Sequence, residues 1–307
     1  MALGVGGGCA SWAVRAPAPY AAPVLSPVAG SLRGVRVLGP SDLPQVRGLL
    51  EEDPLTHVFV ADRVEATRLD PRWLGGRVYG YVEDGRLTAI CHHAANLVPV
   101  AAHPAALDAF TERALADGRT CASLFGVQDE VLTMWEQLQA RWGPARSVRT
   151  DQPFMVATQP GPAECDPYVR RVQLDEIDVL YPASVAMFTE EVGVSPEEKG
   201  RDSYRARVTA LVSQGRVFAR IEDGQVLFKA EIGSLTPSAC QLQGVYVDRA
   251  HRGRGLGTAG VASILRTVLA EGCPAVTLYV NADNEPAKRV YDAVGFCRTN
   301  TFATVLL

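Results

Sequence analysis

The stretch that decides the fold runs from Gly244 to Thr258 and reads Gly-Val-Tyr-Val-Asp-Arg-Ala-His-Arg-Gly-Arg-Gly-Leu-Gly-Thr. Its apolar first part predicts a β-strand that ends at Val247, and apolar positions at helical spacing follow between Val261 and Leu269. The glycines between strand and helix have no Cβ, so the backbone can approach a ligand closely. The free N–H groups of the first helical turn favour an anion there. The segment therefore predicts a loop that binds a pyrophosphate.

Basic side chains accompany the glycines, at Arg249, His251, Arg252 and Arg254. Two other phosphate-binding loops fit this pattern less well. A Rossmann loop is followed by further strand–helix units and an acidic ribose-binding residue, whereas only about fifty residues remain after Thr258. A Walker loop needs Gly-Lys-Ser or Gly-Lys-Thr, which this segment lacks. We therefore expect a phosphate loop of a third kind.

A second motif follows the loop and reads Asn-Glu-Pro-Ala-Lys-Arg-Val-Tyr-Asp-Ala-Val-Gly-Phe over residues 284–296. Asn284, Ala287 and Tyr291 stand at i, i+3 and i+7, so they share one face of a helix. The R-x-x-G-x-G pattern of residues 252–257, followed by N-x-x-A-x-x-x-Y-x-x-x-G-F, resembles the GNAT superfamily of N-acetyltransferases. The resemblance covers residues 169–307. It implies acetyl-CoA as co-substrate and no metal.

The resemblance also implies a role for each motif position. Backbone groups of Val245–Val247 would hold the pantetheine arm, and backbone amides of Gly253–Thr258 would hold the pyrophosphate. Asn284 would bind the cofactor arm, and Tyr291 would protonate the departing CoA thiolate. The implied cofactor-binding residues are Val245, Tyr246, Val247, Arg252, Gly253, Arg254, Gly255, Leu256, Gly257, Thr258, Asn284, Ala287 and Tyr291. From the residues alone, the two valines equally fit the interior of a sheet, and the tyrosine fits a core aromatic position.

The sequence departs from the family pattern where a general base is expected. Many GNAT enzymes have a glutamate on the strand before the glycine loop, at the position of Gln241 in this chain. A glutamine side chain cannot accept a proton at neutral pH. Glu231 on the preceding strand could act in its place through a water, and Glu190 and Glu191 are two further candidates. The catalytic candidates are therefore Gln241, Glu231 and the tyrosine of the second motif.

The missing glutamate bears on the choice of acceptor. At pH 7 a lysine amine with a pKa of about 10.4 is neutral in fewer than about one molecule in a thousand, whereas an α-amine with a pKa of about 7.7–8.0 is about a tenth neutral. A weak or water-relayed base therefore serves an α-amine more easily than a lysine side chain. Our hypothesis is an acceptor whose amine has a low pKa.

The first half of the chain shows the same order of expected elements as the second half. A Glu-Asp-Gly turn between two strand-like segments lies at Glu83–Gly85 and returns at Glu222–Gly224. We therefore predict an α/β (α+β) protein of two tandem GNAT-like modules, each a mixed, mostly antiparallel sheet flanked by helices. The predicted divisions are a flexible tail (1–33), a degenerate GNAT-like module (34–158), a linker (159–166) and an acetyl-CoA-binding GNAT domain (167–307).

The first module lacks the phosphate loop. After Val100, where the glycines are expected, the chain reads Ala-Ala-His-Pro-Ala-Ala-Leu, and Pro99 removes one strand donor. This half resembles the degenerate module of two-module actinobacterial proteins. The resemblance implies a structural role, in which it covers the sheet of the active module and shapes the acceptor cleft.

Composition excludes several other classes of protein. The 307 residues are 47% hydrophobic and 21% charged, with a net charge of −4, which is typical of a soluble globular chain and not of a nucleic-acid-binding or membrane protein. The seven cysteines are scattered and never form a Cys-x-x-Cys pair, so neither a disulfide framework nor a zinc site is expected. We expect a cytoplasmic location and a monomer or weak homodimer.

The sequence therefore predicts an N-acetyltransferase that moves an acetyl group directly from acetyl-CoA to a primary amine of a small molecule, protein or peptide. The alternative is a non-catalytic acyl-CoA sensor, which the glutamine in place of the glutamate favours. Both hypotheses predict acetyl-CoA binding, so only turnover separates them.

Overall fold

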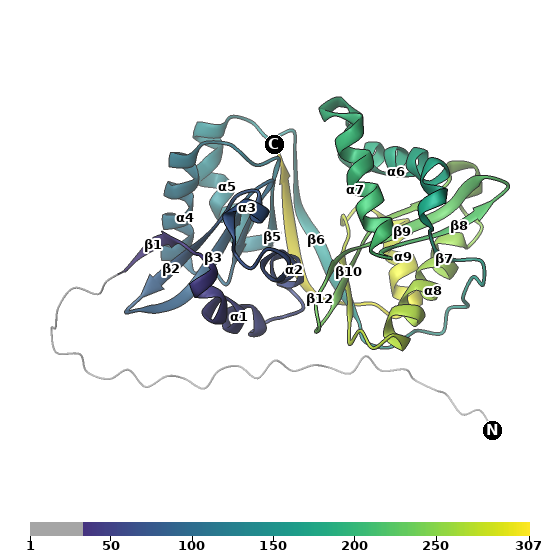
Figure 1. The fold of residues 1–307 in the computed structure, drawn as a ribbon, viewed down its shortest axis with the longest axis horizontal. Coiled ribbons are helices and arrows are strands. Elements are labelled where there is room, and N and C mark those ends of the chain that lie inside the picture. Colours follow the sequence, from purple (N-terminus) through teal and green to yellow (C-terminus); the bar gives the residue numbers. More distant parts are fainter. Residues whose placement is uncertain (1–32) are drawn as a thin grey trace, which may run out of the picture.

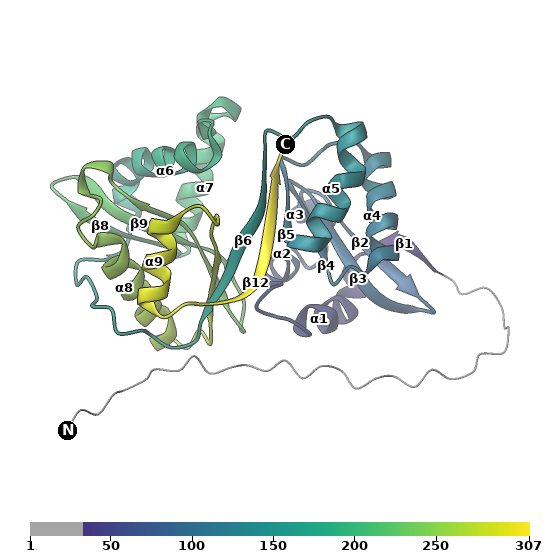
Figure 2. The same cartoon turned by 180° about the vertical axis from the view of Figure 1, so that it is seen from behind.

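The structure is a computed structural model that describes residues 33–307. The predicted flexible tail, residues 1–33, lies outside the described part except for Arg33, the first residue of the first strand. The described chain forms one mixed sheet flanked by helices on both faces (Figures 1 and 2). The predicted fold class is thereby confirmed.

The first half contains a run of helices, a run of strands and then two helix–strand alternations. Its elements are β1 (Arg33–Val37), α1 (Leu43–Glu51), α2 (Val58–Thr67), α3 (Pro71–Leu74), β2 (Arg77–Glu83), β3 (Arg86–His93), β4 (Asn96–Val100), α4 (Pro104–Asp117), β5 (Ser123–Val127), α5 (Gln128–Trp142) and β6 (Ser147–Ala157). The Glu83–Gly85 turn joins β2 to β3 as expected, with positive φ at Asp84 and Gly85. The sequence did not indicate α2 or α3.

The second half repeats this plan. Its elements are β7 (Arg170–Arg171), α6 (Ile177–Val192), α7 (Arg201–Ser213), β8 (Val217–Glu222), β9 (Gln225–Leu235), β10 (Cys240–Val247), α8 (Leu256–Ala270), β11 (Val276–Tyr279), α9 (Glu285–Val294) and β12 (Cys297–Leu306). β7 is a strand of only two residues, whereas β9 and β12 have eleven and ten. No described helix is long and apolar enough to cross a membrane.

The last strands of the two halves are exchanged. The sheet order is β1-β2-β3-β4-β5-β12-β6-β11-β10-β9-β8-β7. The strand β6, which ends the first half, pairs with β11 of the second, and β12, which ends the chain, pairs with β5 of the first. The two exchanged strands also pair with each other in the middle of the sheet (Figure 1). The halves of the sequence are therefore not the halves of the sheet.

The hydrophobic cores follow the exchange. Met155 and Ala157 of β6 pack with α8 and α9 in the core of the second half. Ala303 and Val305 of β12 pack with α4 and α5 in the core of the first. Each half therefore completes its core with a strand of the other, and neither predicted module is a self-contained packing unit.

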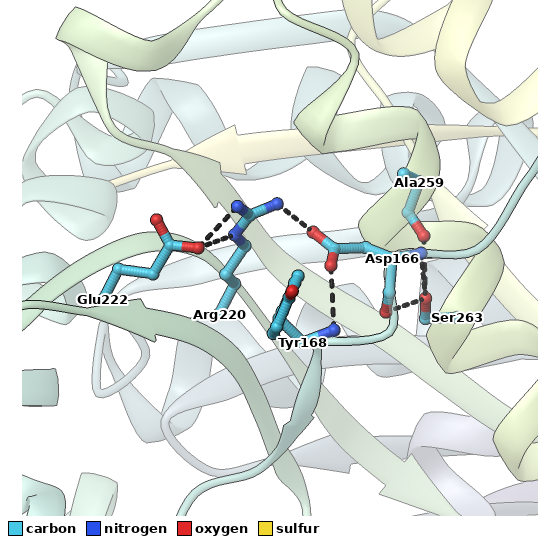
Figure 3. A network of polar contacts seen from close by, with 6 residues as sticks. All are labelled: Asp166, Tyr168, Arg220, Glu222, Ala259 and Ser263. Atoms are coloured by element: carbon cyan, nitrogen blue, oxygen red, sulfur yellow. Dashed lines mark hydrogen bonds and ion pairs between the residues drawn. The ribbon is translucent and has the colours of Figure 1, made fainter.

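A buried polar network fixes the segment between the halves (Figure 3). The Asp166 carboxylate pairs with Arg220 of β8 at 2.8 Å and accepts the Tyr168 N–H at 2.9 Å. The hydroxyl of Ser263 on α8 accepts the Asp166 N–H at 2.8 Å and donates to the Asp166 carbonyl at 2.9 Å. The end of the predicted linker is thus held on α8 and β8.

Candidate active site

A cavity of about 1340 Å³ lies where β10 and β11 diverge. The two strands pair in parallel only at Cys240–Val276 and Gln241–Thr277, while β10 continues to Val247. The walls come from β6, β9, β10, β11 and α6, α7, α8 and α9. The cavity exceeds the usual volume of a small-molecule site, so it has room for two substrates side by side.

A β-bulge shapes the wall formed by β10. The pairing of β10 with β9 shifts between Gln243 and Tyr246, and Gly244 adopts a φ of +59°. A Cβ at Gly244 would lie 3.0 Å from Met187 Cε and 3.4 Å from Glu231 Cδ, so only glycine fits this turn without displacement. The residues predicted to hold a pantetheine arm, 245–247, follow the bulge and line the cavity.

The glycine loop meets the cavity as predicted. Gly253 and Gly255 have φ of +75° and +81°, and a Cβ at either position would meet no heavy atom within 4 Å. Both line the cavity, as do Leu256, Gly257 and Thr258 of the first turn of α8. No side chain caps this helix end, so the N–H groups of its first turn are available to a ligand. These residues fit the pyrophosphate of a CoA molecule.

The arginines of the loop are held by Glu190 at the end of α6. Arg252 and Arg249 each pair with one oxygen of the Glu190 carboxylate at 2.7 Å, and Arg252 also donates to the Val247 carbonyl at 3.0 Å. Burial raises the pKa of Glu190, but the hydrogen bonds and charges of the two arginines hold it below its ordinary value. Arg254 is exposed and is not among the residues that line the cavity. In this arrangement the backbone amides are the free anion-binding groups of the loop.

The second motif forms α9, whose face borders the cavity. Asn284 caps the helix, because its side-chain oxygen accepts the Ala287 N–H at 3.2 Å. Asn284, Ala287 and Tyr291 all line the cavity, so the predicted shared face exists. The predicted contact of Asn284 with the cofactor arm stays a prediction.

Tyr291 is almost completely buried at the wall of the cavity. Burial, with the charge of Glu191 added, raises the pKa of its hydroxyl well above the usual value. The phenol therefore keeps its proton at neutral pH. A protonated group beside the cavity is what a general acid requires.

The two candidate base positions lie together, and one of them is ion-paired. Gln241 and Glu231 are both buried, and both line the cavity. The Glu231 carboxylate pairs with the fully buried Lys229 at 2.5 Å and accepts a hydrogen bond from Gln243 at 3.4 Å. Burial raises the pKa of Glu231, but the Lys229 charge and hydrogen bond, with Arg207 farther off, hold it below its ordinary value. Glu231 is therefore a carboxylate at neutral pH, and a weak base.

Other cavity residues escaped the sequence analysis. Ser147–Asp151 of β6 line the cavity although they belong to the first half, because the exchanged strand brings them there. Arg149 among them pairs with Glu191 at 3.4 Å. Arg207 of α7 and Arg289 of α9 line the cavity too. The repeated Glu-Asp-Gly turn indicated two halves of like order, but it does not predict an exchange of strands between them.

The first half contains a second divergence, between β4 and β5, which is closed. These strands pair in parallel only at Asn96–Ser123 and Leu97–Leu124. Phe125 then packs edge-on against Phe59, with 4.9 Å between the ring centroids. Where the other half presents free loop amides, the Ala102 N–H donates to the Glu130 carboxylate at 2.9 Å. In the first half, therefore, side chains of the protein itself fill the gap between the strands and bind the loop amide.

In the comparison with known proteins, the two halves of the chain match different family models. Residues 180–296 match the acetyltransferase (GNAT) family, and residues 76–180 match a domain of unknown function, DUF4081. The mycothiol acetyltransferase of Corynebacterium aurimucosum is 38% identical over 61 residues, which are 20% of this chain and 20% of that protein. The match thus spans a fifth of the length of the curated relative.

Solved structures share the fold over most of the chain. A GCN5-related N-acetyltransferase from Sphaerobacter thermophilus superposes with a TM-score of 0.59 at 18% identity, covering 89% of this chain and 94% of that one. A tandem GNAT protein from the clavulanic acid biosynthesis pathway superposes with a TM-score of 0.51 at 17% identity, covering 89% and 98%. At such identities the likeness shows the fold alone.

The fold of two tandem modules and the acetyltransferase match agree on where the site lies. The loop that presents free amides, the diverging strands and the residues that match the acetyltransferase (GNAT) family coincide in the second module.

Proposed function

We propose that the second module transfers an acetyl group from acetyl-CoA to a primary amine, directly within one ternary complex. The observation that carries the proposal is the single cavity that joins the free amides of the glycine loop to Tyr291. If the phosphates of acetyl-CoA lie at the loop, its pantetheine arm can run along residues 245–247 and bring the thioester to Tyr291 within that one cavity.

The residues supply a complete set of proton transfers for this reaction. The amine nitrogen attacks the thioester carbonyl carbon, the carbon–nitrogen bond forms and the carbon–sulfur bond breaks. The Tyr291 hydroxyl gives its proton to the departing sulfur, and backbone N–H groups near Val245 stabilise the oxyanion. The proton of the amine passes through a water beside Gln241 to the Glu231 carboxylate. The acid and the base then exchange protons with solvent.

The weak base supports an acceptor of low amine pKa. Glu231 is held by Lys229, and Gln241 takes no proton. An acceptor that is already partly neutral at pH 7 needs the least help from such a pair. The name of the curated relative adds mycothiol acetyltransfer as one acceptor chemistry to try. A cytoplasmic location and a monomeric or weakly dimeric state stay predictions.

A non-catalytic acyl-CoA sensor is the second candidate. It is favoured by one observation, the ion pair that lowers the basicity of Glu231 beside a glutamine. A sensor binds acetyl-CoA at the same loop and leaves the thioester intact.

The Tyr291→Phe variant tests the proposal. We expect its kcat for amine acetylation to fall by about 100-fold or more, because the leaving thiolate loses its acid, while the Kd for acetyl-CoA stays the same. Thiol release over a panel of amines measures kcat, and calorimetry measures Kd. Tyr279→Phe is the matched control, since Tyr279 is a second, partly buried tyrosine at the cavity and has no role in the proposed reaction.

Equal losses in both variants would point to altered packing of the cavity instead of acid catalysis. Acetyl-CoA binding by the wild type without turnover of any amine would favour the sensor.

A further inference from the structure

We define the α7 side of the cavity by four of its lining residues, Tyr204, Arg207, Glu231 and Gln243. On this side the acidic group has an ion-pair partner, whereas the arginine has none among the residues that the structure describes. Of the five carboxylates that line the cavity, four pair with a basic side chain, and the exposed Asp283 forms no ion pair in the described part of the chain. The pairs are Glu231 with Lys229, Glu191 with Arg149, Glu190 with Arg249 and Arg252, and Asp151 with Arg298. Glu231, the one carboxylate of the α7 side, is therefore already neutralised by Lys229.

Two lining arginines differ from the rest. Within residues 33–307, Arg207 and Arg289 form neither an ion pair nor a side-chain hydrogen bond, although both border the cavity. Arg289 lies on α9, whose Val290 is 3.6 Å from the position of a Cβ on Gly257 of the glycine loop. Arg207 lies on α7 and borders the same cavity as Glu231. The two arginines without an ion pair therefore stand on two different walls of the cavity.

More positive charge stands behind Arg207, at the junction of the two halves. Asp62 of α2 is buried and pairs with Arg63 at 2.6 Å and with Arg216 at 3.4 Å. Burial lowers the pKa of the Arg63 guanidinium, Asp62 raises it, and the charges of Arg207 and Arg216 lower it further. Arg63 and Arg216 therefore share the Asp62 carboxylate, and the charge of Arg207 adds to theirs on the side of the cavity.

We propose that the acceptor is a small amine that also carries an oxyanion, either a carboxylate or a phosphate, and that Arg207 binds that group. The inference rests on the proposed function and narrows its acceptor. An arginine fork matches the geometry of both oxyanions. Binding the anion at Arg207 sets the amine beside Glu231 and Gln241, where its proton can leave. Arg207 determines specificity in this scheme and takes no part in proton transfer.

The test compares matched acceptors with and without the negative charge. The acceptors are amino acids against their carboxamides, and phosphoethanolamine against ethanolamine. For the wild type we expect kcat/KM about 10- to 100-fold higher for the charged member of at least one kind of pair, as for a charge-assisted hydrogen bond. A preference for amino acids over their carboxamides would indicate a carboxylate, and a preference for phosphoethanolamine over ethanolamine would indicate a phosphate.

The Arg207→Gln variant should abolish this preference. Its KM for the charged acceptor should rise by the same factor, with kcat, the neutral acceptors and the KM for acetyl-CoA little changed. Arg205→Gln is the matched control on the same helix, because Arg205 pairs with the exposed Asp178 and does not line the cavity. Arg289→Gln should instead raise the KM for acetyl-CoA alone.

Equal kcat/KM for charged and neutral acceptors would overturn the inference while leaving amine acetylation intact. An Arg207→Gln variant whose kcat/KM falls equally for charged and neutral acceptors would overturn it too. If no amine is turned over, the proposed function fails, and product binding decides the inference by itself. Calorimetry in the presence of CoA would then compare N-acetyl amino acids and N-acetyl phosphoethanolamine with their neutral counterparts. Preference for the anionic product that is lost in Arg207→Gln supports the inference, and its absence refutes it.

Discussion

The two pairs of diverging strands, β4/β5 in the first half and β10/β11 in the second, start from the same geometry and end differently. Each pair forms a parallel ladder at two positions before it separates. In the second half the separation leads into a cavity of about 1340 Å³, and in the first half Phe125 packs where the strands part. The fold thus provides two equivalent places, and the side chains decide which one can accept a ligand.

The loops after β4 and β10 explain the difference. The loop after β10 contains glycines with positive φ and leaves the first amides of α8 uncapped. The loop after β4 gives the Ala102 amide to Glu130, whose other carboxyl oxygen is buried without a partner in the described structure. The Glu130 carboxyl group thus accepts a loop amide in the first half, whereas in the second half the loop amides are proposed to bind a phosphate. The comparison teaches that the loop amide after β4 is used by a side chain of the protein itself, whereas the amides after β10 stay available to a ligand.

The largest effect is expected from opening the closed side. Phe125→Ala removes a buried ring that packs against Phe59 and Tyr279. The free energy of unfolding should fall by about 3–4 kcal/mol, as for other buried phenylalanines. Urea unfolding measures this loss, and calorimetry should still find one acetyl-CoA bound per chain because Glu130 keeps the loop amide. A second bound equivalent would mean that packing alone, and not the loop, closes this half.

The next effect concerns the open side. Gly255→Val places a side chain at the mouth of the loop, and the Kd for acetyl-CoA should rise about 100-fold, which is about 2.7 kcal/mol. Gly272→Val is the matched control, because Gly272 also has a positive φ and open surroundings but does not line the cavity. Both variants should lose about 1–2 kcal/mol of stability from backbone strain. Similar Kd values in the two would show that strain, and not the loop, weakens binding.

The smallest effect is a pH dependence in the closed half. Burial raises the pKa of Glu130 to about 7, although the Ala102 N–H acts in the opposite direction. Because the folded pKa exceeds the unfolded one, this group stabilises the protein fully below about pH 4.5, and the contribution is lost as the pH rises through 7. Glu130→Gln should therefore be more stable than the wild type by about 2 kcal/mol at pH 8, after allowance for partial exposure, and nearly equal at pH 5.

Urea unfolding between pH 5 and pH 8 measures this change. Glu136→Gln, an exposed position on the same helix, is the control and should leave the slope of stability against pH unchanged. If the free energy of unfolding of Glu130→Gln changes with pH as steeply as that of the wild type, another group causes the pH dependence.

Much of the fold and the site could be predicted because the signals are local. The strand, loop and helix around residues 244–258 follow from the spacing of apolar residues and glycines, and the helix with Asn284 and Tyr291 follows from its own periodicity. The sequence alone also indicated two halves of like order, through the repeated Glu-Asp-Gly turn. Each of these inferences depends on neighbours within about one element of the chain.

Only the tertiary structure decided what lies far apart in sequence. The exchange of β6 and β12 depends on pairing between strands that are equally compatible by pattern, so the sequence could not assign Arg149 to the cavity of the other half. Alternation along β9 places Lys229 and Glu231 on one face, yet their burial, and hence the weakness of the base, depends on what packs over them. The sequence alone thus located the proposed phosphate loop and the proposed acid, whereas long-range packing decided the surroundings of Glu231, the place of β6 in the cavity wall and the closure of the first half.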